Sequence, residues 1–493
     1  MKKIYVKTLI VIMALGFVSC ESFLEESPKH LVTIENYYKT EQDALSAVNS
    51  VYAYFNSYST GSTAGIYHST FWVTAGLASD ELLNNQIGSP QYDQLANFSQ
   101  TPKNAALEEI WAIHYKTISL ANIAIERIPS IEMDEALRTR YVGEAKFLRA
   151  LLYFNLVRMF GKVPLLIEEN AGLYPPQSDV DVIYQQIIKD LSDAFPVLPK
   201  SYPIGNGRGR ATWGAAKSLL SKVYLTTKQW DLAASNAKDV IDSNVYSLWD
   251  DFGEVFKLSS RGGKEAVFSI GFGDGGGAIS FWEVGQFLVR LLPTELSVEG
   301  VQNAQGWQIP TMYLYSAFDI DDRRREITFI TEINNTDGTT KTIRPYIKKY
   351  WDRDAEPKGN ESSNDFPVIR YAEVLLIYAE ALNEIGGANT NTALEYINKV
   401  RKRARYNGTT YEDTLPDYSG LNQEQTREAI LKERMFEFVA EGHRWFDLVR
   451  FNKLESLVKL AKPTITPTSK NYLFPIPQYE IDLNKNLVQN PNY

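Results

Sequence analysis

The chain is poor in cysteine and histidine, the two residue types that most often bind transition metals in proteins. It has one cysteine in 493 residues, which excludes an internal disulfide and, for a single chain, a thiolate zinc site or an iron–sulfur cluster. The four histidines show neither an HExxH motif nor paired spacing, which disfavours a zinc hydrolase. We therefore expect no cofactor, no metal site and no metal-dependent catalysis.

Long apolar runs are absent after the first twenty residues, and basic residues are in the minority. Lys and Arg number 51 against 60 Asp and Glu, which gives a formal charge of −9. This acidic balance argues against nucleic acid as a partner and against an anionic membrane surface. No later segment has the roughly 20 apolar residues that a transmembrane helix needs. With 44% hydrophobic and 23% charged residues, the composition is that of a globular protein.

The N-terminus has the features of an export signal. Three lysines accompany a short apolar run over residues 4–18, and the only cysteine, Cys20, follows Ser19. This arrangement resembles a bacterial lipoprotein signal; an ordinary secretory signal with a chance cysteine is the alternative. We expect removal of residues 1–19 and acylation of Cys20, so that lipid chains anchor the protein. Loss of the three lysines would change the charge from −9 to −12.

Residues 20–35 form a polar, acidic stretch that we expect to act as a tether. Glu21, Glu25 and Glu26 follow the cysteine closely. Acidic residues at this point resemble the surface-export signal of Bacteroidetes lipoproteins. We therefore expect an outer-membrane protein that faces the cell exterior, with the periplasmic face as the alternative.

Most of the remaining chain shows the three- and four-residue apolar spacing that is typical of amphipathic helices. The clearest cases are residues 41–55, 105–128 and 137–159. We expect a mainly α protein.

Three of the predicted helices resemble one another. Each carries Ala, Leu and an aromatic residue on one face: GEAKFLRALLY (143–153), GAAKSLLSKVY (214–224) and RYAEVLLIYAEAL (370–382). The second and third are followed by further helices rich in small residues, at 228–241 and 391–404, and a fourth pair is expected to include 426–451. Such pairs are typical of a tetratricopeptide-like scaffold, because small residues allow neighbouring backbones to approach.

The centre of the chain differs in character from both ends. Between residues 245 and 367 glycine, asparagine and tryptophan are more frequent, the helical period fades, and short alternating runs such as 265–270 predict strands. We therefore divide the chain into an N-terminal helical half (36–244), a loop-rich insertion with short strands (245–367), and a C-terminal helical half with a closing strap (368–493). A long insertion in a helical scaffold is a common place for recognition.

Four ordered segments resemble the SusD/RagB family of Bacteroidetes outer-membrane lipoproteins, and the resemblance spans nearly the whole mature chain. They are SFLEESPKH followed by residues 33–55, VIRYAEVLLIYAEALNEIG (368–386) followed by INKVRKRA (397–404), ILKERMFEFVAEGHRWFDLVRF (430–451), and LFPIPQYEIDLNKNLVQNPNY (473–493). The resemblance implies a glycan-binding surface lipoprotein. It also implies that the protein is a lid on a SusC-like, TonB-dependent transporter that imports oligosaccharides.

Candidate ligand-binding residues are aromatic and amide side chains outside the predicted helical cores, because sugars offer flat C–H faces and a polar rim. Residues 69–85 resemble the family segment that forms one wall of the glycan site, and this chain has Asn84, Asn85 and Gln86 where relatives carry an aromatic residue. The insertion supplies the other wall. The candidates are Tyr67, His68, Asn84, Gln86, Tyr92, Trp282 and Trp307.

Three charged or glycine-rich patterns imitate catalytic motifs. Gly271, Gly273 and Gly276 form GxGxxG, but no βαβ pattern surrounds them, so a loop is expected. Glu433, Glu437 and Glu441 lie on one helical face beside basic residues, which predicts structural ion pairs. The run DIDDRRRE (319–326) lacks the spacing of a calcium loop and predicts a solvated charge run or a turn.

The leading hypothesis is thus a non-enzymatic glycan-binding lipoprotein with a transporter partner. A surface glycoside hydrolase is one alternative, because sequence cannot exclude two carboxylates at catalytic spacing. A helical-repeat lipoprotein that binds peptides or proteins is another.

Overall fold

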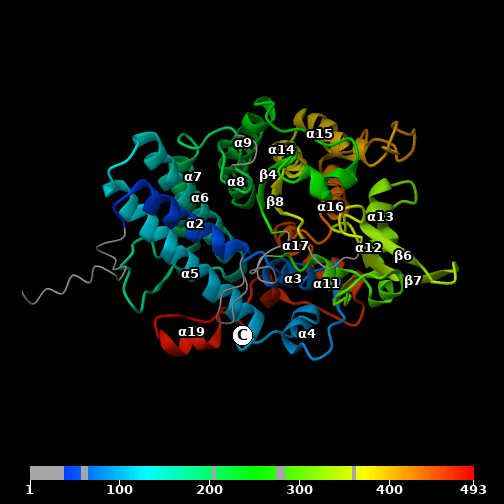
Figure 1. Ribbon diagram of the computed structural model, residues 1–493, viewed down its shortest axis with the longest axis horizontal. Helices are drawn as coiled ribbons and strands as arrows, with labels where there is room; N and C mark the ends of the chain where they lie inside the picture. The colour runs from blue at the N-terminus through cyan, green and yellow to red at the C-terminus, as the bar shows by residue number, and fades with distance from the viewer. Residues whose placement is uncertain (1–37, 57–64, 203–206, 274–283, 358–361) are drawn as a thin grey trace, which may run out of the picture. The chain divides into compact units, whose positions relative to one another are not determined.

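Long helices with apolar faces make up most of the structure. The computed structural model describes residues 38–56, 65–202, 207–273, 284–357 and 362–493 (Figure 1). Helices α2 (Glu41–Asn56), α5 (Ala105–Arg127) and α6 (Glu135–Phe160) lie where apolar periodicity predicted them, and they pack side by side at the left of Figure 1. The mainly α fold is therefore confirmed.

Helix pairs follow, as the repeated segments predicted. α6 packs on α7 (Val180–Ala194), and α8 (Trp213–Thr226) packs on α9 (Trp230–Asp242). α14 (Tyr371–Ile385) contacts both α9 and its own partner α15 (Asn389–Arg403), so helices on either side of the central segment pack together. Small residues allow these close contacts. A Cβ atom added to Gly143 on α6 would lie 2.5 Å from the side chain of Val197, just beyond α7.

Residues 426–451 hold two helices with a break between them. α16 (Gln423–Glu437) begins with a capping box at Asn422, and α17 (Arg444–Arg450) follows after six residues. Within the break Ala440 and Gly442 have φ angles of 57° and 73°, a left-handed backbone that no helix can continue through. α18 (Leu454–Ala461) completes this part of the chain.

The central segment contains short strands, as predicted, and every pair is antiparallel. β4 (Ala266–Ile270) pairs with β8 (Phe366–Arg370), and β6 (Phe329–Asn334) pairs with β7 (Thr340–Ile347). The pair of β1 (Leu82–Asn84) and β5 (Gln308–Pro310) joins the N-terminal half to the insertion. A fourth pair joins β2 (Val163–Pro164) to β3 (Gln177–Ser178).

Short helices fill the space between these elements. They are α3 (Thr70–Leu77), α4 (Pro90–Ala96), α11 (Phe287–Leu291), α12 (Met312–Ala317), α13 (Arg323–Thr328) and α19 (Gln478–Leu483), with the 3₁₀ helices η2 (Ile128–Ser130), η3 (Phe252–Phe256), η4 (Leu258–Ser260), η5 (Thr294–Glu299) and η6 (Ser469–Tyr472). α3 is buried along its whole length and forms part of the main core.

The last residues of the chain run along the C-terminal end of α6. The Phe474 N–H donates to the Met159 carbonyl at 2.8 Å, and the Asn490 amide donates to the carbonyls of Phe160 and Phe474 at 2.9 and 2.7 Å. These bonds satisfy carbonyls at the end of α6 that the helix itself cannot pair.

A buried ion network connects the insertion to the C-terminal helices. Arg370 contacts Glu265 at 2.9 Å, Glu437 at 2.5 Å and Glu441 at 2.8 Å. Glu437 also contacts Arg324 at 2.9 Å and Arg403, and each of these side chains is at most 2% exposed. The prediction that Glu433, Glu437 and Glu441 form structural ion pairs is therefore confirmed, although Glu441 lies beyond the end of α16 and not on the same helical face.

Candidate functional site

The pairing of β1 with β5 places the amide-rich loop after β1 beside Trp307. Asn84 lies opposite Gln308 in the register. The Asn85 N–H donates to the Trp307 carbonyl at 2.7 Å, and its side-chain amide donates to the Gly306 carbonyl at 3.1 Å. The two sequence regions that were expected to face each other, 84–92 and the insertion, are thus in direct contact.

A close turn precedes Trp307. Gly306 has a φ angle of 56°, and a Cβ atom there would lie 2.6 Å from the ring of Tyr346 on β7. Only glycine fits both the left-handed backbone and this contact. The turn therefore holds Trp307 at a set position at the start of β5.

Arg290 of α11 lies between two of the candidate aromatic residues. The carbon of its guanidinium group is 5.3 Å from the ring centroid of Tyr92 and 5.2 Å from that of Trp307, within cation–π range. Its nitrogens donate to Gln286 at 2.8 Å and to Gln308 at 3.3 Å. Among the described residues, no carboxylate lies within 4.0 Å of this buried cation.

Arg290 was not among the residues that the sequence predicted for the site. One feature of the sequence does point to Arg290: it lies within the apolar run FLVRLL (287–292). A charged side chain in such a run needs partners elsewhere in the fold. We name the group formed by Asn84, Asn85, Gln86, Tyr92, Arg290 and Trp307 the Trp307 site.

The rim of the Trp307 site is polar and accessible. Asn85 is exposed, and Asn84, Gln86 and Trp307 are half-buried. The Asn84 amide donates to the carboxylate of Asp93 at 2.7 Å, which orients the amide and leaves its carbonyl near the backbone of Gln86. An accessible indole, amides that donate and accept, and a nearby guanidinium can stack on a sugar face and hydrogen-bond its hydroxyl groups.

Tyr92 lies beneath this rim, not on it. Its side chain is 6% exposed, and its hydroxyl lies 3.5 Å from the Arg290 guanidinium. Tyr92 therefore supports Arg290 and Trp307 from below.

Tyr67 and His68 lie in the core, in contrast to their expected place in a ligand site. Both are 2% exposed, because they come just before α3, which is buried along its whole length. The Tyr67 N–H donates to the Phe55 carbonyl, and its ring packs against those of Phe55, Phe71 and Phe366. The Tyr67 hydroxyl accepts a hydrogen bond from Asn155 at 3.0 Å, and burial raises its pKa to about 12. Neither side chain offers a surface to a ligand.

The electrostatics of His68 nevertheless report on the Trp307 site. Burial, and secondarily the positive charge of Arg290, lower the pKa of His68 to about 4. The imidazole is therefore neutral at physiological pH.

Two expected functional residues cannot be placed. Trp282 and Cys20 lie outside the residues that the structure describes. Across the described ranges, no group of three His, Cys, Asp or Glu side chains could hold a metal ion. Within the same ranges, no helix has the length and apolar character needed to cross a membrane.

The charge run 319–326 begins with an exposed turn over residues 319–321, as expected, but its second half is partly buried, which corrects the expectation there. Its last residues begin α13, and Asp322 and Arg324 are 1% and 0% exposed. The Arg324 guanidinium contacts Asp322 at 2.8 Å and Glu433 at 2.7 Å, so the run joins the buried ion network. Sequence periodicity could not show this, because the partners come from a distant helix.

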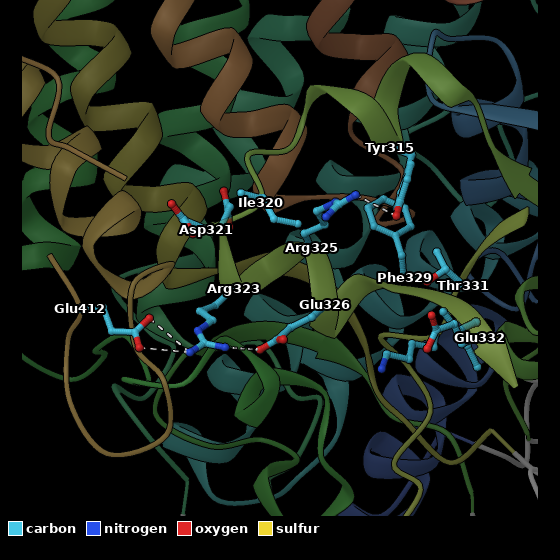
Figure 2. A pocket seen from close by; sticks show the side chains of 13 residues that line it. Tyr315, Ile320, Asp321, Arg323, Arg325, Glu326, Phe329, Thr331, Glu332 and Glu412 are labelled. Carbon is cyan, nitrogen blue, oxygen red and sulfur yellow. Dashed lines mark hydrogen bonds and ion pairs between the residues drawn. The ribbon is translucent and has the colours of Figure 1, made fainter. Parts of the chain in front are cut away.

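A separate cavity of about 540 Å³ lies beside this run, between α13 and β6 (Figure 2). Arg323 bridges Glu326 at 3.0 Å and Glu412 at 3.2 Å there, and Arg325 donates to the Tyr315 hydroxyl at 2.8 Å. The Arg325 guanidinium also lies 4.6 Å from the Tyr315 ring centroid.

The fold is a scaffold of helix pairs, and the Trp307 site places aromatic and amide side chains together on it. A sequence profile of the SusD family matches residues 330–493, and a profile described as "starch-binding associating with outer membrane" matches residues 23–225. SusD-like protein P2 of Formosa agariphila is 32% identical over 99% of both chains. The chain belongs to the SusD family.

Solved structures agree with this assignment. A SusD superfamily protein from Parabacteroides distasonis has a TM-score of 0.79 at 25% identity, over 92% of this chain and 99% of that one. A laminarin-binding SusD-like protein has a TM-score of 0.76 at 25% identity, over 92% of this chain and 100% of that one. The starch-binding protein SusD of Bacteroides thetaiotaomicron is 25% identical over 87% of this chain and 86% of its own length.

Proposed function

We propose that this protein is a non-enzymatic, surface-exposed lipoprotein that captures oligosaccharides and passes them to a SusC-like, TonB-dependent outer-membrane transporter, on which it acts as a lid. The observation that carries the glycan-binding part is the Trp307 site, where a half-buried indole, three amide side chains and a buried guanidinium meet at the surface. Relatives named for laminarin and starch binding support the same ligand class.

The proposed mode of binding follows from the chemistry of the side chains. Trp307 stacks on the C–H face of one sugar ring, while Asn84, Asn85 and Gln86 exchange hydrogen bonds with its hydroxyl groups. Arg290 lies against the indole and holds the ring in place. Such an open site covers few sugar faces, so we expect modest affinity, which suits release into a transporter.

The binding test is isothermal titration of laminarihexaose and maltoheptaose into the purified protein and into Trp307→Ala. We expect at least one of the two glucans to bind the wild type, and the substitution to weaken its binding by about tenfold or more, as for the loss of one stacked aromatic. Trp230→Ala, which removes another half-buried tryptophan on α9, serves as the control and should leave binding unchanged. Equal binding to the wild type and Trp307→Ala would remove Trp307 from the site.

Trp282→Ala is the matching test for the second predicted tryptophan. The sequence alone carries this proposal, so the expected result is weaker glucan binding with an unchanged unfolding temperature. Unchanged titration would leave Trp307 as the sole aromatic platform.

The lipid anchor is proposed from the position of Cys20. We expect the protein to incorporate a fatty-acid label in a bacterial host and to partition into the membrane fraction, and Cys20→Ser to abolish both. Labelling of the serine variant would contradict the proposal.

Protease treatment of intact cells tests which side of the outer membrane the protein faces. A protein on the cell exterior is degraded, and a periplasmic protein is protected.

The transporter role has its own test. Mild detergent extraction from the native membrane should recover the protein together with a large β-barrel protein, and a solitary protein would count against the lid role.

Two further measurements address the alternative functions. Released reducing ends after incubation with a glycan panel would indicate a hydrolase, and saturable binding of peptides without any glycan binding would indicate a peptide receptor.

A further inference from the structure

A second cavity, of about 240 Å³, lies where α6, α8, α16 and α17 meet the C-terminal residues. It shares no residue with the Trp307 site. Part of its wall is apolar and aromatic, from Val157, Tyr184, Leu225, Phe446, Val449, Tyr472 and Leu473. The rest is polar or charged, and it includes the four cationic side chains of Arg158, Lys222, Arg434 and Arg450.

Arg158 is the cation in this wall that has no counter-ion. Its guanidinium carbon lies 3.8 Å from the ring centroid of Phe154 and 3.9 Å from that of Phe446, so two rings sandwich it. Its nitrogens donate to the Phe154 carbonyl at 2.9 Å and to Asn155 at 3.0 Å. Of the carboxylates in the described part of the chain, none lies within 4.0 Å of these nitrogens.

The other three cations share three carboxylates. Lys222 contacts Glu373 at 2.7 Å, and burial lowers its pKa to about 8. Arg434 contacts Glu373 at 3.3 Å and Asp447 at 2.8 Å.

Arg450 completes this set of charges. It contacts Asp447 at 3.0 Å and Glu380 at 2.7 Å. Four cations thus face three carboxylates, and one positive charge is left over.

A buried N–H group at this cavity also lacks an acceptor. Arg434 is 3% exposed, and its Nη1 has no hydrogen-bond partner among the described residues. His443 is 6% exposed, and its Nδ1 lies 3.3 Å from both the Lys222 ammonium group and a carboxylate oxygen of Glu373.

We propose that this cavity binds a small organic anion, a carboxylate with an apolar body. The carboxylate would accept from Arg434 and Arg158 and balance the surplus charge, and the apolar body would lie against Tyr184, Leu225 and Tyr472. A buried donor without an acceptor is costly, and a bound carboxylate removes that cost by forming charge-assisted hydrogen bonds.

The test compares benzoate with benzyl alcohol, which has a similar shape and no charge, by isothermal titration and thermal unfolding of the purified protein. We expect benzoate to bind saturably with one site per chain and to raise the unfolding temperature, and benzyl alcohol to do neither. Added salt should weaken benzoate binding, because the contact is ionic. Equal behaviour of the two compounds, or no saturable benzoate binding, overturns the proposal.

Two variants locate the site. Arg158→Met keeps an unbranched side chain between the two phenylalanine rings and should weaken benzoate binding by about tenfold or more, as expected for a lost charge-assisted hydrogen bond. Thr226→Trp places a large ring at the cavity wall and should block binding without altering any charge. The control is Arg127→Gln, at a distant arginine that pairs with Glu169. Wild-type affinity in Thr226→Trp, or in a folded Arg158→Met, would overturn the assignment to this cavity.

Discussion

At the scale of single residues, Arg290 couples two neighbouring features, the aromatic platform and a buried histidine. Its charge and the burial of His68 act in the same direction on the imidazole. Replacing Arg290 should therefore change both the recognition surface and the titration of His68, which gives the Trp307 site a readout that is independent of any ligand.

We predict that Arg290→Met raises the pKa of His68 from about 4 towards its ordinary value without reaching it, because burial, the larger cause, remains. Titration of the imidazole proton resonances by NMR measures this shift. His114, whose pKa burial alone holds at about 4, has no contact with Arg290 and should not move. An unchanged His68 would show that Arg290 does not act on it.

The sequence could predict Asn84, Gln86 and Trp307 as surface residues, because polar amides and an isolated tryptophan in a loop-rich segment are rarely core. It could not predict the burial of Tyr67 and His68. Their depth depends on a backbone hydrogen bond to Phe55 and on the packing of α3 inside the core, neither of which leaves a local pattern. Arg290 was missed because its partners are far away in the sequence.

At the scale of the elements, close helix packing depends on a few small residues. Gly214 in the first turn of α8 faces Tyr246, and a Cβ atom there would lie 2.4 Å from the tyrosine ring. The Tyr246 hydroxyl lies 2.9 Å from the Oγ1 atom of Thr212, the N-cap residue of the same helix. The start of α8 is therefore in direct contact with the loop that follows α9.

We predict that Gly214→Ala lowers the free energy of unfolding by about 1–3 kcal/mol, as for overpacking, although alanine favours a helix. The double variant Gly214→Ala/Tyr246→Ala should lose less than the sum of the two single variants, because the second change makes room for the added methyl group. Urea unfolding monitored by circular dichroism measures all four proteins. Additive losses would contradict the proposed contact.

The helices could be predicted well from apolar spacing, and their observed bounds differ from the expected ones by a few residues. The break between α16 and α17 could not be predicted from the sequence. The left-handed conformation of Ala440 is imposed by its contacts, because alanine does not favour it. Its N–H donates to the side chain of Glu81, which lies hundreds of residues earlier. The burial of Asp322 and Arg324 could not be predicted for the same reason, because Arg324 pairs with Glu433 on a distant helix.

At the scale of the whole molecule, the buried ion network joins the insertion to the C-terminal helices. Burial would raise the pKa of Glu437, but the guanidinium groups of Arg403, Arg370 and Arg324 outweigh it and hold the pKa below its ordinary value. The charged form of Glu437 therefore stabilises the fold at pH values above the pKa of a glutamate in the unfolded chain. That contribution disappears as the pH falls towards the folded pKa.

We predict that Glu437→Gln lowers the free energy of unfolding at neutral pH by about 3–5 kcal/mol, because buried guanidinium groups lose a counter-ion. The difference from the wild type should shrink below about pH 4.5, where the native contribution of Glu437 fades. Glu424→Gln, an exposed carboxylate that pairs with Arg427 on the surface, is the control and should change stability little. An equal loss at neutral and acidic pH would show that charge is not the cause.

The pairing of β1 with β5 has a consequence for the order in which the protein can fold. Asp80 is held by Arg444 at 2.7 Å, and the Leu77 carbonyl by Lys462 at 2.7 Å. During synthesis from the N-terminus, residues 77–85 are made long before Arg444 and Lys462. Contacts of such sequence separation form slowly. The segment that carries β1 therefore cannot gain these contacts until residues 444–462 have been made.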